Sequence, residues 1–417
     1  MYPACDGAPM SIGSLTQSHT IRSPDHIEYG SGAVAALEPF VAERGIESAL
    51  VVTDEQLAAG GVVDPALARL ETAGVDVAVY DGVAPEPKLS MVEAAAERVA
   101  DTDLVVGVGG GSSMDTAKLA AALAEHGGPV REMLGMDNVP GPTGPLALVP
   151  TTAGTGSEVT HIGVFADERD GGVKKVVFSP HLFADLAAVD PDLTKTLPPG
   201  VAAATGLDAL THAIESYVSL LRTPYTDTLA RRAVELVAEN LRPAVAQGPA
   251  NDDARANMSL AATLAGQAFV NSGLGAVHAL TYPLGMECGL GHGLANGVLL
   301  PHVMRYNVPA EVERFAELAA LLGEQRRPGE SDRAFADRGV DAVFDLLEDV
   351  DVPTSIAGYG DFDRETFAEW ADVAFEYSEH NIDRNPRAMD REDVIGVFEA
   401  AAAGRGATGD HGASRGR

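Results

Sequence analysis

The sequence predicts a two-domain protein, in which an α/β domain built on a parallel, Rossmann-like sheet is followed by an all-α domain. Its 417 residues exceed the usual size of a single hydrophobic core. In the N-terminal half, short apolar or β-branched runs alternate with Ala-rich helical stretches, and beyond about Leu197 these runs stop. We therefore expect an N-terminal extension over residues 1–22, the α/β domain over 23–196, the helical domain over 197–402 and a disordered tail over 403–417.

Local patterns predict the individual elements. Strands are expected at the short β-branched or apolar runs Ala49–Val52, Val75–Tyr80, Leu104–Val108 and Leu146–Val149, and the third of these is expected to be buried. Residues 159–180 are expected to form a β-hairpin, with its turn at Asp170, Gly171 and Gly172, and residues 189–200 to link the domains. The helices of the second domain are expected to break at Pro224, Pro243, Pro249, Pro283 and Pro301.

A glycine-rich turn lies between a predicted strand and a predicted helix. The strand Leu104–Val108 leads into the three consecutive glycines 109–111, and the helix is expected to begin near Ser112 or Ser113. Glycines let backbone N–H groups approach an anion closely, and a helix N-terminus adds about half a positive charge. An ordinary strand-to-helix turn is the alternative, but the pattern favours a pyrophosphate site.

A second loop of small residues follows the strand that ends at Val149. It offers hydroxyl groups and free amides with almost no bulk, through Thr151, Thr152, Gly154, Thr155 and Gly156. This composition favours a loop that lines a bound cofactor over a solvent loop.

Three imidazoles and one carboxylate in the C-terminal half suggest a metal site. Asp208 and His212 stand at i and i+4 in a predicted helix, so both side chains leave the same face. His278 and His292 follow in two later segments. Three nitrogen donors and one oxygen donor suit Fe(II) or Zn(II) and leave a position for substrate, although a His in such a helix is often a structural residue.

Six segments resemble those of the iron-containing (group III) alcohol dehydrogenases. They are GGGSSMDTAK, PTTAGTGSEVT, GLDALTHAIESY, the segment around His278, GHGLANGVLLPHVMRYN and NPRAMDREDV, collinear from about His26 to about Ala402. The resemblance implies that NAD, with NADP as the alternative, binds with its pyrophosphate at Gly109, Gly110, Gly111 and Ser112. It also implies that a divalent metal, with Fe(II) expected and Zn(II) or Mn(II) as alternatives, is held by Asp208, His212, His278 and His292.

The function that these sites imply is hydride transfer between nicotinamide and a primary or hydroxy-substituted alcohol, in a cleft between the two domains. The metal would acidify the alcohol or polarise the carbonyl, and the nicotinamide would exchange the hydride. The alternatives are a lyase of the dehydroquinate synthase type, which the absence of any Lys after Lys195 disfavours, and a non-catalytic metal or nucleotide binder.

Three further residues are candidates near this site. Asp54 ends a predicted strand, where it would accept from the adenosine ribose and repel a 2′-phosphate, or else cap a helix. Lys175 would reach the nicotinamide-side ribose, as in relatives, or be a solvated hairpin lysine. Tyr282 stands where many family members have His, and we assign it a catalytic role as hydrogen-bond donor to the substrate oxygen. This Tyr-Pro version resembles the branch with 4-hydroxybutyrate dehydrogenases and hydroxyacid-oxoacid transhydrogenases.

Composition limits the partners and the setting. The net charge of −32 excludes nucleic acid as a partner, because phosphate contacts need a basic patch. A strongly acidic chain that is poor in Lys indicates a halophilic protein from a high-salt cytoplasm. Two cysteines give no disulfide framework, and no apolar run is long enough to span a bilayer. We expect a cytoplasmic enzyme that forms a homodimer or a higher homo-oligomer.

Overall fold

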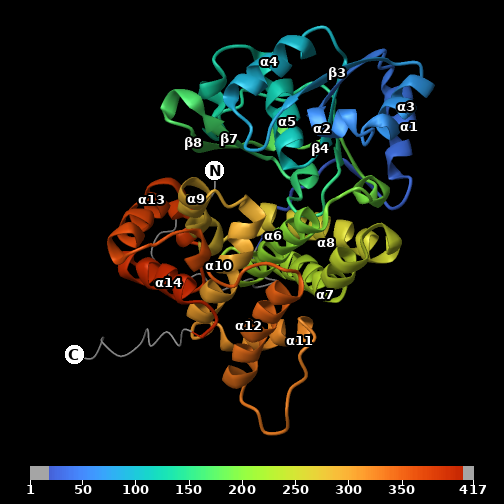
Figure 1. Cartoon of the computed structure of the whole chain (residues 1–417). Coiled ribbons are helices and arrows are strands. Elements are labelled where there is room, and N and C mark those ends of the chain that lie inside the picture. Colours follow the sequence, from blue (N-terminus) through green and yellow to red (C-terminus); the bar gives the residue numbers. More distant parts are fainter. Residues whose placement is uncertain (1–17, 407–417) are drawn as a thin grey trace. The chain divides into compact units, whose positions relative to one another are not determined.

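The computed structural model describes residues 18–406 (Figure 1). The predicted N-terminal extension therefore lies mostly outside the described residues, as does most of the predicted tail. The chain divides into two compact units, one formed by Ile21–Leu197 and the other by the chain from Pro198 onward. Each unit is built around its own type of secondary structure.

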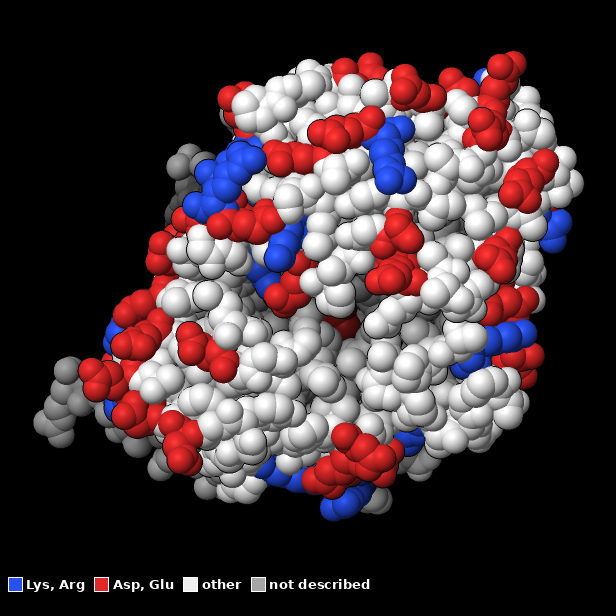
Figure 2. All heavy atoms as spheres, turned by 45° about the horizontal axis from the view of Figure 1, so that its top comes forward, with Lys and Arg blue, Asp and Glu red and all other residues white. Residues whose placement is uncertain are grey.

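The surface is acidic. The chain has 61 Asp and Glu against 29 Lys and Arg. On the face that Figure 2 shows, acidic side chains are widely distributed, and several of the fewer basic side chains lie beside them. Among the described residues, Lys174 pairs with Glu86 and Lys195 pairs with Asp192.

The first unit contains a six-stranded parallel sheet. Its strand order is β1-β9-β6-β4-β2-β3. The strands are β1 His26–Tyr29, β2 Ser48–Asp54, β3 Asp76–Val83, β4 Leu104–Gly109, β6 Leu146–Pro150 and β9 Leu186–Val189. The four predicted strands are thus confirmed as β2, β3, β4 and β6, whereas β1 and β9 were not predicted. Both are only four residues long, and β1 (HIEY) lacks an apolar run.

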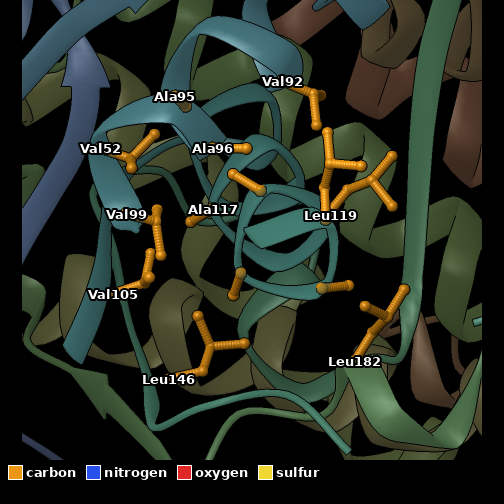
Figure 3. Packing of buried hydrophobic residues seen from close by; sticks show 14 of the residues in the cluster. Val52, Val92, Ala95, Ala96, Val99, Val105, Ala117, Leu119, Leu146 and Leu182 are labelled. Carbon is orange, nitrogen blue, oxygen red and sulfur yellow. The ribbon is translucent and has the colours of Figure 1, made fainter. Parts of the chain in front are cut away.

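Helices cover both faces of this sheet, which is why β4 and β6 are apolar throughout and wholly buried. The helices are α1 Leu37–Arg44, α2 Glu55–Ala59, α3 Asp64–Thr72, α4 Leu89–Val99 and α5 Gly111–His126. Figure 3 shows one core cluster, where Val92 and Val99 of α4 and Leu119 of α5 pack with strand residues Val52 and Val105. A separate cluster on other residues of the same strands includes side chains of α1 and α3.

A small second sheet has the strand order β5-β8-β7. Its strands are β5 Gly135–Met136, β7 Ile162–Asp167 and β8 Val173–Phe178. The antiparallel pairing of β7 with β8 confirms the predicted hairpin. Gly171 and Gly172 in its turn have φ of 65° and 81°, which glycine adopts without strain.

The second unit is helical, and its described residues contain no strand. Its helices are α6 Pro199–Val218, α7 Pro224–Gln247, α8 Asp252–Ser272, α9 Ala276–Cys288, α10 His292–Asn307, α11 Val312–Leu321, α12 Asp332–Asp349, α13 Arg364–Ile382 and α14 Arg391–Ala403. Across the described residues of both units, short 3₁₀ helices occur at Ala33–Ala36, Val130–Met133, Ser157–Val159, Glu168–Asp170, Pro180–Leu182, Pro191–Thr194, Gly248–Ala250 and Ala357–Tyr359.

The expected proline breaks are only partly right. Pro224 begins α7, and Pro249 lies between α7 and α8. Pro243, Pro283 and Pro301 instead lie inside α7, α9 and α10, so the breaks predicted there are wrong. An internal proline costs a helix one backbone hydrogen bond, but α9 and α10 are held by many buried side chains around it, and tertiary packing outweighs local propensity.

No single helix within residues 18–406 is long and apolar enough to cross a membrane. Only α8 and α9 taken together reach that length and composition, and they are bent by 108°.

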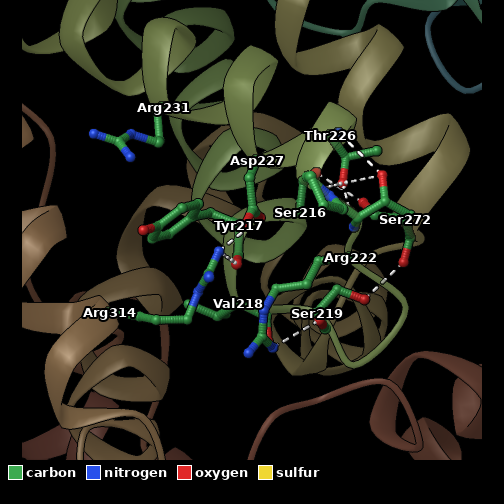
Figure 4. A network of polar contacts seen from close by, with 12 residues as sticks. Ser216, Tyr217, Val218, Ser219, Arg222, Thr226, Asp227, Arg231, Ser272 and Arg314 are labelled. Atoms are coloured by element: carbon green, nitrogen blue, oxygen red, sulfur yellow. Dashed lines mark hydrogen bonds and ion pairs between the residues drawn. The ribbon is translucent and has the colours of Figure 1, made fainter. Parts of the chain in front are cut away.

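A polar network fixes the C-terminal end of α6 (Figure 4). The Arg314 guanidinium donates to the Tyr217 carbonyl and to the Asp227 carboxylate, both at 2.6 Å, and lies 3.7 Å from the centre of the Tyr217 ring. Nearby, the Ser219 hydroxyl donates to the Ser272 carbonyl of α8 at 2.6 Å. Because α6 carries two of the predicted metal ligands, this network also stabilises the backbone that presents them.

Candidate functional site

Helices α6, α9 and α10 bring the four predicted metal ligands together. One donor atom from each of Asp208, His212, His278 and His292 lies within 4.8 Å of the others. The Nε2 atoms of the three histidines lie 3.6, 4.0 and 3.7 Å from Oδ1 of Asp208, in chain order. Ligand atoms around one tetrahedral ion with bonds of about 2.0–2.2 Å are separated by roughly 3.3–3.6 Å. The residues present therefore fit a single divalent ion after a small contraction.

The surroundings of these ligands are mostly dry. Asp208, His212 and His278 are buried, whereas the side chain of His292, the first residue of α10, is 48% exposed. The His212 ring packs against Phe269 at 4.4 Å and stacks on His278 at 4.8 Å between ring centroids. The ligand set is thus held by packing and is reachable from solvent on the His292 side.

The carboxylate of Asp208 is kept ionised by its neighbours. Burial alone would raise its pKa, but the three imidazoles and the Asn296 amide together outweigh this effect and lower the pKa. An anionic oxygen with three imidazole nitrogens is a donor set suited to Fe(II) or Zn(II).

Asn296 is a site residue that the sequence analysis missed. Its Nδ2 donates to Asp208 Oδ1 at 2.8 Å and lies 3.1 and 3.2 Å from Nε2 of His278 and His292. Its Oδ1 accepts from the Thr281 hydroxyl at 2.5 Å, which sets the direction of the amide. Its place four residues after His292, on the same predicted helix, is the signal that could have identified it.

The glycine turn has the compact geometry expected of an anion site. A Cβ atom at Gly109 would lie 2.6 Å from Ser113 Oγ, and one at Gly111 would lie 3.0 Å from Thr155 Cγ2. The helix α5 begins at Gly111, one residue earlier than the earlier of the two predicted starts, and has no side-chain cap. Its first N–H groups are therefore of the kind that bind a phosphate group.

The threonine-rich loop lies directly beside this turn. The Thr151 N–H donates to the Gly109 carbonyl at 2.9 Å, and a Cβ at Gly110 would lie 3.4 Å from Thr152 Cγ2. Oγ1 of Thr152 is buried and has no hydrogen-bond partner within the part of the chain that the structure describes. Buried hydroxyl groups normally have a partner, so this one fits a bound group such as a dinucleotide phosphate.

Asp115 and Lys118 fasten this loop to α5. Lys118 is wholly buried, and its Nζ donates to Ser157 Oγ at 2.7 Å, to the Ile162 carbonyl at 2.9 Å and to Asp115 Oδ1 at 3.3 Å. Asp115 also accepts from Ser157 Oγ at 2.6 Å and from the Val164 N–H at 3.0 Å. Burial lowers the pKa of Lys118, and the neighbouring carboxylate acts in the opposite direction.

Asp54 and Lys175 have structural partners of their own. Asp54 ends β2, the neighbour of β4, and its Oδ1 caps α2 by accepting from the Leu57 N–H at 2.9 Å. Lys175, on β8, pairs with Asp170 of the hairpin turn at 2.9 Å. The capping alternative for Asp54 is therefore present, and the cofactor roles of both residues stay predictions.

Tyr282 lies one turn after His278 on α9. Its ring stacks on Tyr377 of α13, with the centroids 5.7 Å apart and an interplanar angle of 9°. Ser378, the next residue of α13, has non-helical backbone angles. The aromatic pair is thus formed by a helix that carries a metal ligand and by a kinked helix that packs against it.

Comparisons with known proteins match almost the whole chain. Residues 24–191 match the family described as iron-containing alcohol dehydrogenase, and residues 202–402 match the C-terminal part of the Fe-containing alcohol dehydrogenase family. The long-chain-alcohol dehydrogenase 1 of Geobacillus thermodenitrificans is 41% identical, over 90% of this chain and 94% of that protein. The sulfoacetaldehyde reductase of Bilophila wadsworthia is 38% identical, over 90% of this chain and 96% of that protein.

Among solved structures, the sulfoacetaldehyde reductase of Bifidobacterium kashiwanohense in complex with NAD⁺ superimposes with a TM-score of 0.83. It is 29% identical, and the match covers 93% of this chain and 99% of that one.

We expect Lys118→Met to lower the free energy of unfolding by about 3 kcal/mol or more, because removing one partner of a buried ion pair leaves the other uncompensated. Lys195→Met is the matched control, since Lys195 also pairs with an aspartate three residues away but is 41% exposed, and it should cost about 0–1 kcal/mol. Urea unfolding measures both variants. Equal losses would contradict the role given to Lys118.

Proposed function

The chain belongs to the iron-containing alcohol dehydrogenase family and is a metal-dependent oxidoreductase acting on CH–OH groups, and from this premise we propose how its own residues divide the work. The metal ligands are Asp208, His212, His278 and His292. The dinucleotide-binding residues are Asp54, Gly109, Gly110, Gly111, Ser112, Thr151, Thr152, Thr155 and Lys175. The convergence of four donor atoms within 4.8 Å is the observation that carries the proposal.

When bound, a divalent ion supplies Lewis acidity toward the alcohol or carbonyl oxygen, and the nicotinamide supplies or accepts the hydride. Asp208 contributes the anionic donor, and the buried imidazoles of His212 and His278 keep water away from two sides. The exposed edge at His292 admits the substrate. Tyr282, one turn beyond His278, donates a hydrogen bond to the substrate oxygen.

The dinucleotide is held by backbone and hydroxyl groups. The first N–H groups of α5 bind the pyrophosphate. The Thr152 hydroxyl, which has no hydrogen-bond partner among the described residues, donates a hydrogen bond to the same pyrophosphate. NAD is the preferred cofactor and NADP the alternative, because the Asp54 carboxylate accepts from ribose hydroxyls and repels a 2′-phosphate.

Removal of the metal tests the proposal directly. Treatment with a chelator should abolish alcohol oxidation and aldehyde reduction, and Fe(II), Zn(II) or Mn(II) should restore them to different extents. His278→Ala should bind less metal but still bind NAD, since the glycine turn belongs to the other unit. His26→Ala, an exposed histidine of β1, is the control and should bind metal like the wild type. Full turnover in a metal-free sample would refute the proposal.

Cofactor choice depends on one charge at Asp54. Asp54→Asn keeps an oxygen that accepts from the Leu57 N–H but removes the charge, so the preference for NAD over NADP should narrow by roughly tenfold while the melting temperature stays unchanged. The kcat/KM values for both cofactors measure this effect. A wild type that prefers NADP would contradict the assignment.

The substrate class follows from Tyr282. We assign small aldehydes and alcohols that carry a second polar group, in place of plain aliphatic ones. The names of the sulfoacetaldehyde reductase and of a 39% identical 1,3-propanediol dehydrogenase of Klebsiella pneumoniae agree with this choice, whereas the name of the 41% identical long-chain-alcohol dehydrogenase favours aliphatic substrates. The resemblance of the Tyr-Pro segment also keeps a 4-hydroxybutyrate dehydrogenase or a hydroxyacid-oxoacid transhydrogenase as the alternative.

Tyr282→Phe should lower kcat/KM for a polar aldehyde by about tenfold to a hundredfold, because one buried hydrogen bond is lost, at roughly 1–3 kcal/mol. Tyr377→Phe is the control, since it keeps the ring stack but lacks its own hydroxyl, and it should change kcat/KM little. Unchanged kcat/KM for both polar and aliphatic aldehydes in Tyr282→Phe would show that Tyr282 only fills space.

We propose a cytoplasmic, halophilic homo-oligomer as the working form, and the acidic composition supports the halophilic part of this proposal. Repulsion among carboxylates is poorly screened at 0.01 M salt, where the Debye length is about 30 Å. The melting temperature should therefore rise between dilute buffer and molar KCl. An unchanged melting temperature would remove the high-salt assignment.

A further inference from the structure

Glu215 is buried on α6 and contacts one metal ligand from behind. It is 3% exposed, and its Oε2 lies 2.5 Å from Nδ1 of His278. Its other oxygen, Oε1, accepts from the Val277 N–H at 2.6 Å. One carboxylate therefore binds both the ring of the ligand and the backbone beside it.

The Val277 contact completes the N-terminus of α9. Gly275 precedes this helix and provides no side-chain cap, so the first N–H groups of α9 need partners from elsewhere. Glu215 of α6 supplies one such partner, because its Oε1 accepts from the Val277 N–H. A Cβ at Gly275 would lie only 3.0 Å from Glu215 Oε1, so the glycine leaves room for the carboxylate.

The two nitrogens of His278 then have different roles. An ionised carboxylate only accepts hydrogen bonds, so the proton of the neutral ring is placed on Nδ1 and the lone pair on Nε2. The contacts of Nε2 agree with this assignment, because Asn296 Nδ2, a donor, lies 3.1 Å from it. Nε2 is also the nitrogen that faces Asp208.

We propose that Glu215 is a positioning residue of the metal centre, which fixes the tautomer and the orientation of His278 and caps α9 with the same carboxylate. The inference rests on the proposed metal site. Partners of this kind behind a metal-binding histidine typically change metal affinity by tenfold to a hundredfold.

The test is Glu215→Gln in the full-length protein. A glutamine has one acceptor oxygen and one NH₂ group, so its NH₂ must face either the Val277 N–H or His278 Nδ1. The dissociation constant for Zn(II), measured by competition with a chromophoric chelator, should rise about tenfold to a hundredfold. The ¹⁵N shifts of His278 in the metal-free protein should also lose the pure Nδ1–H pattern of the wild type.

Ser216→Ala is the matched control. Ser216 is the next residue on α6 and is fully buried, and its hydroxyl shares a hydrogen bond of 2.7 Å with Ser272, which is not one of the four ligands. This variant should bind Zn(II) within about twofold of the wild type. If Glu215→Gln and Ser216→Ala bind Zn(II) equally well, the inference is overturned.

Two further variants keep the test decisive. If Glu215→Gln does not fold, Gly275→Ala places a Cβ 3.0 Å from Glu215 Oε1, shifts the carboxylate slightly without removing its charge, and should weaken Zn(II) binding by a smaller factor. Wild-type affinity in this variant overturns the inference. Asp208→Asn tests the metal site itself. If Asp208→Asn loses Zn(II) but the Glu215 and Gly275 variants do not, only the role of Glu215 is refuted. If Asp208→Asn binds Zn(II) as the wild type does, the metal site is refuted and the proposed function with it.

Discussion

One carboxylate oxygen and three imidazole nitrogens lie close together inside the helical unit, and the packing around them depends on which groups interact with their lone pairs. A buried carboxylate and three imidazole lone pairs repel one another unless a cation or hydrogen-bond donors lie among them. Asn296 provides such a donor, because its Nδ2 is within 3.2 Å of Asp208, His278 and His292. The direction of this amide is set by Thr281, whose hydroxyl donates to Asn296 Oδ1 at 2.5 Å.

The helices that carry these four residues are held in place by contacts elsewhere in the unit. The C-terminal end of α6 is held by the Arg314 network, and its middle carries Asp208, His212 and Glu215, all buried. Close packing also contributes, since a Cβ at Gly293 would lie 2.3 Å from the Ala204 carbonyl of α6. The near contact of α10 with α6 is therefore possible only with glycine next to His292.

Sequence reasoning identified what depends on neighbours along the chain. Short apolar or β-branched runs predicted β2, β3, β4 and β6, and the i, i+4 spacing placed Asp208 and His212 on one face. Sequence reasoning failed where contacts between residues far apart in the sequence determine the secondary structure. Pro283 and Pro301 sit within helices because of tertiary packing, and β1 and β9 are too short to show a pattern.

The same limit applies within the site. His278 and His292 are too far from Asp208 in sequence for spacing to assign them, so they were assigned by family resemblance. Asn296 and Glu215 lie on the same helices as ligands, but choosing them requires knowing which faces pack together. The cap made by Asp54 was one of two readings that its sequence position allowed.

The distribution of lysine has a practical consequence for chemical modification. All five lysines precede Pro198, so the helical unit has no primary amine on a side chain. Lys118 is wholly buried and the Lys174 side chain is 18% exposed. The amines of Lys88, Lys175 and Lys195 are therefore the most accessible to reagents. Amine-directed reagents, whether acetyl donors, dyes or activated resins, would therefore attach through the α/β unit or the chain's N-terminal amine. A protein immobilised in this way would keep the helices that carry the proposed metal ligands chemically unmodified.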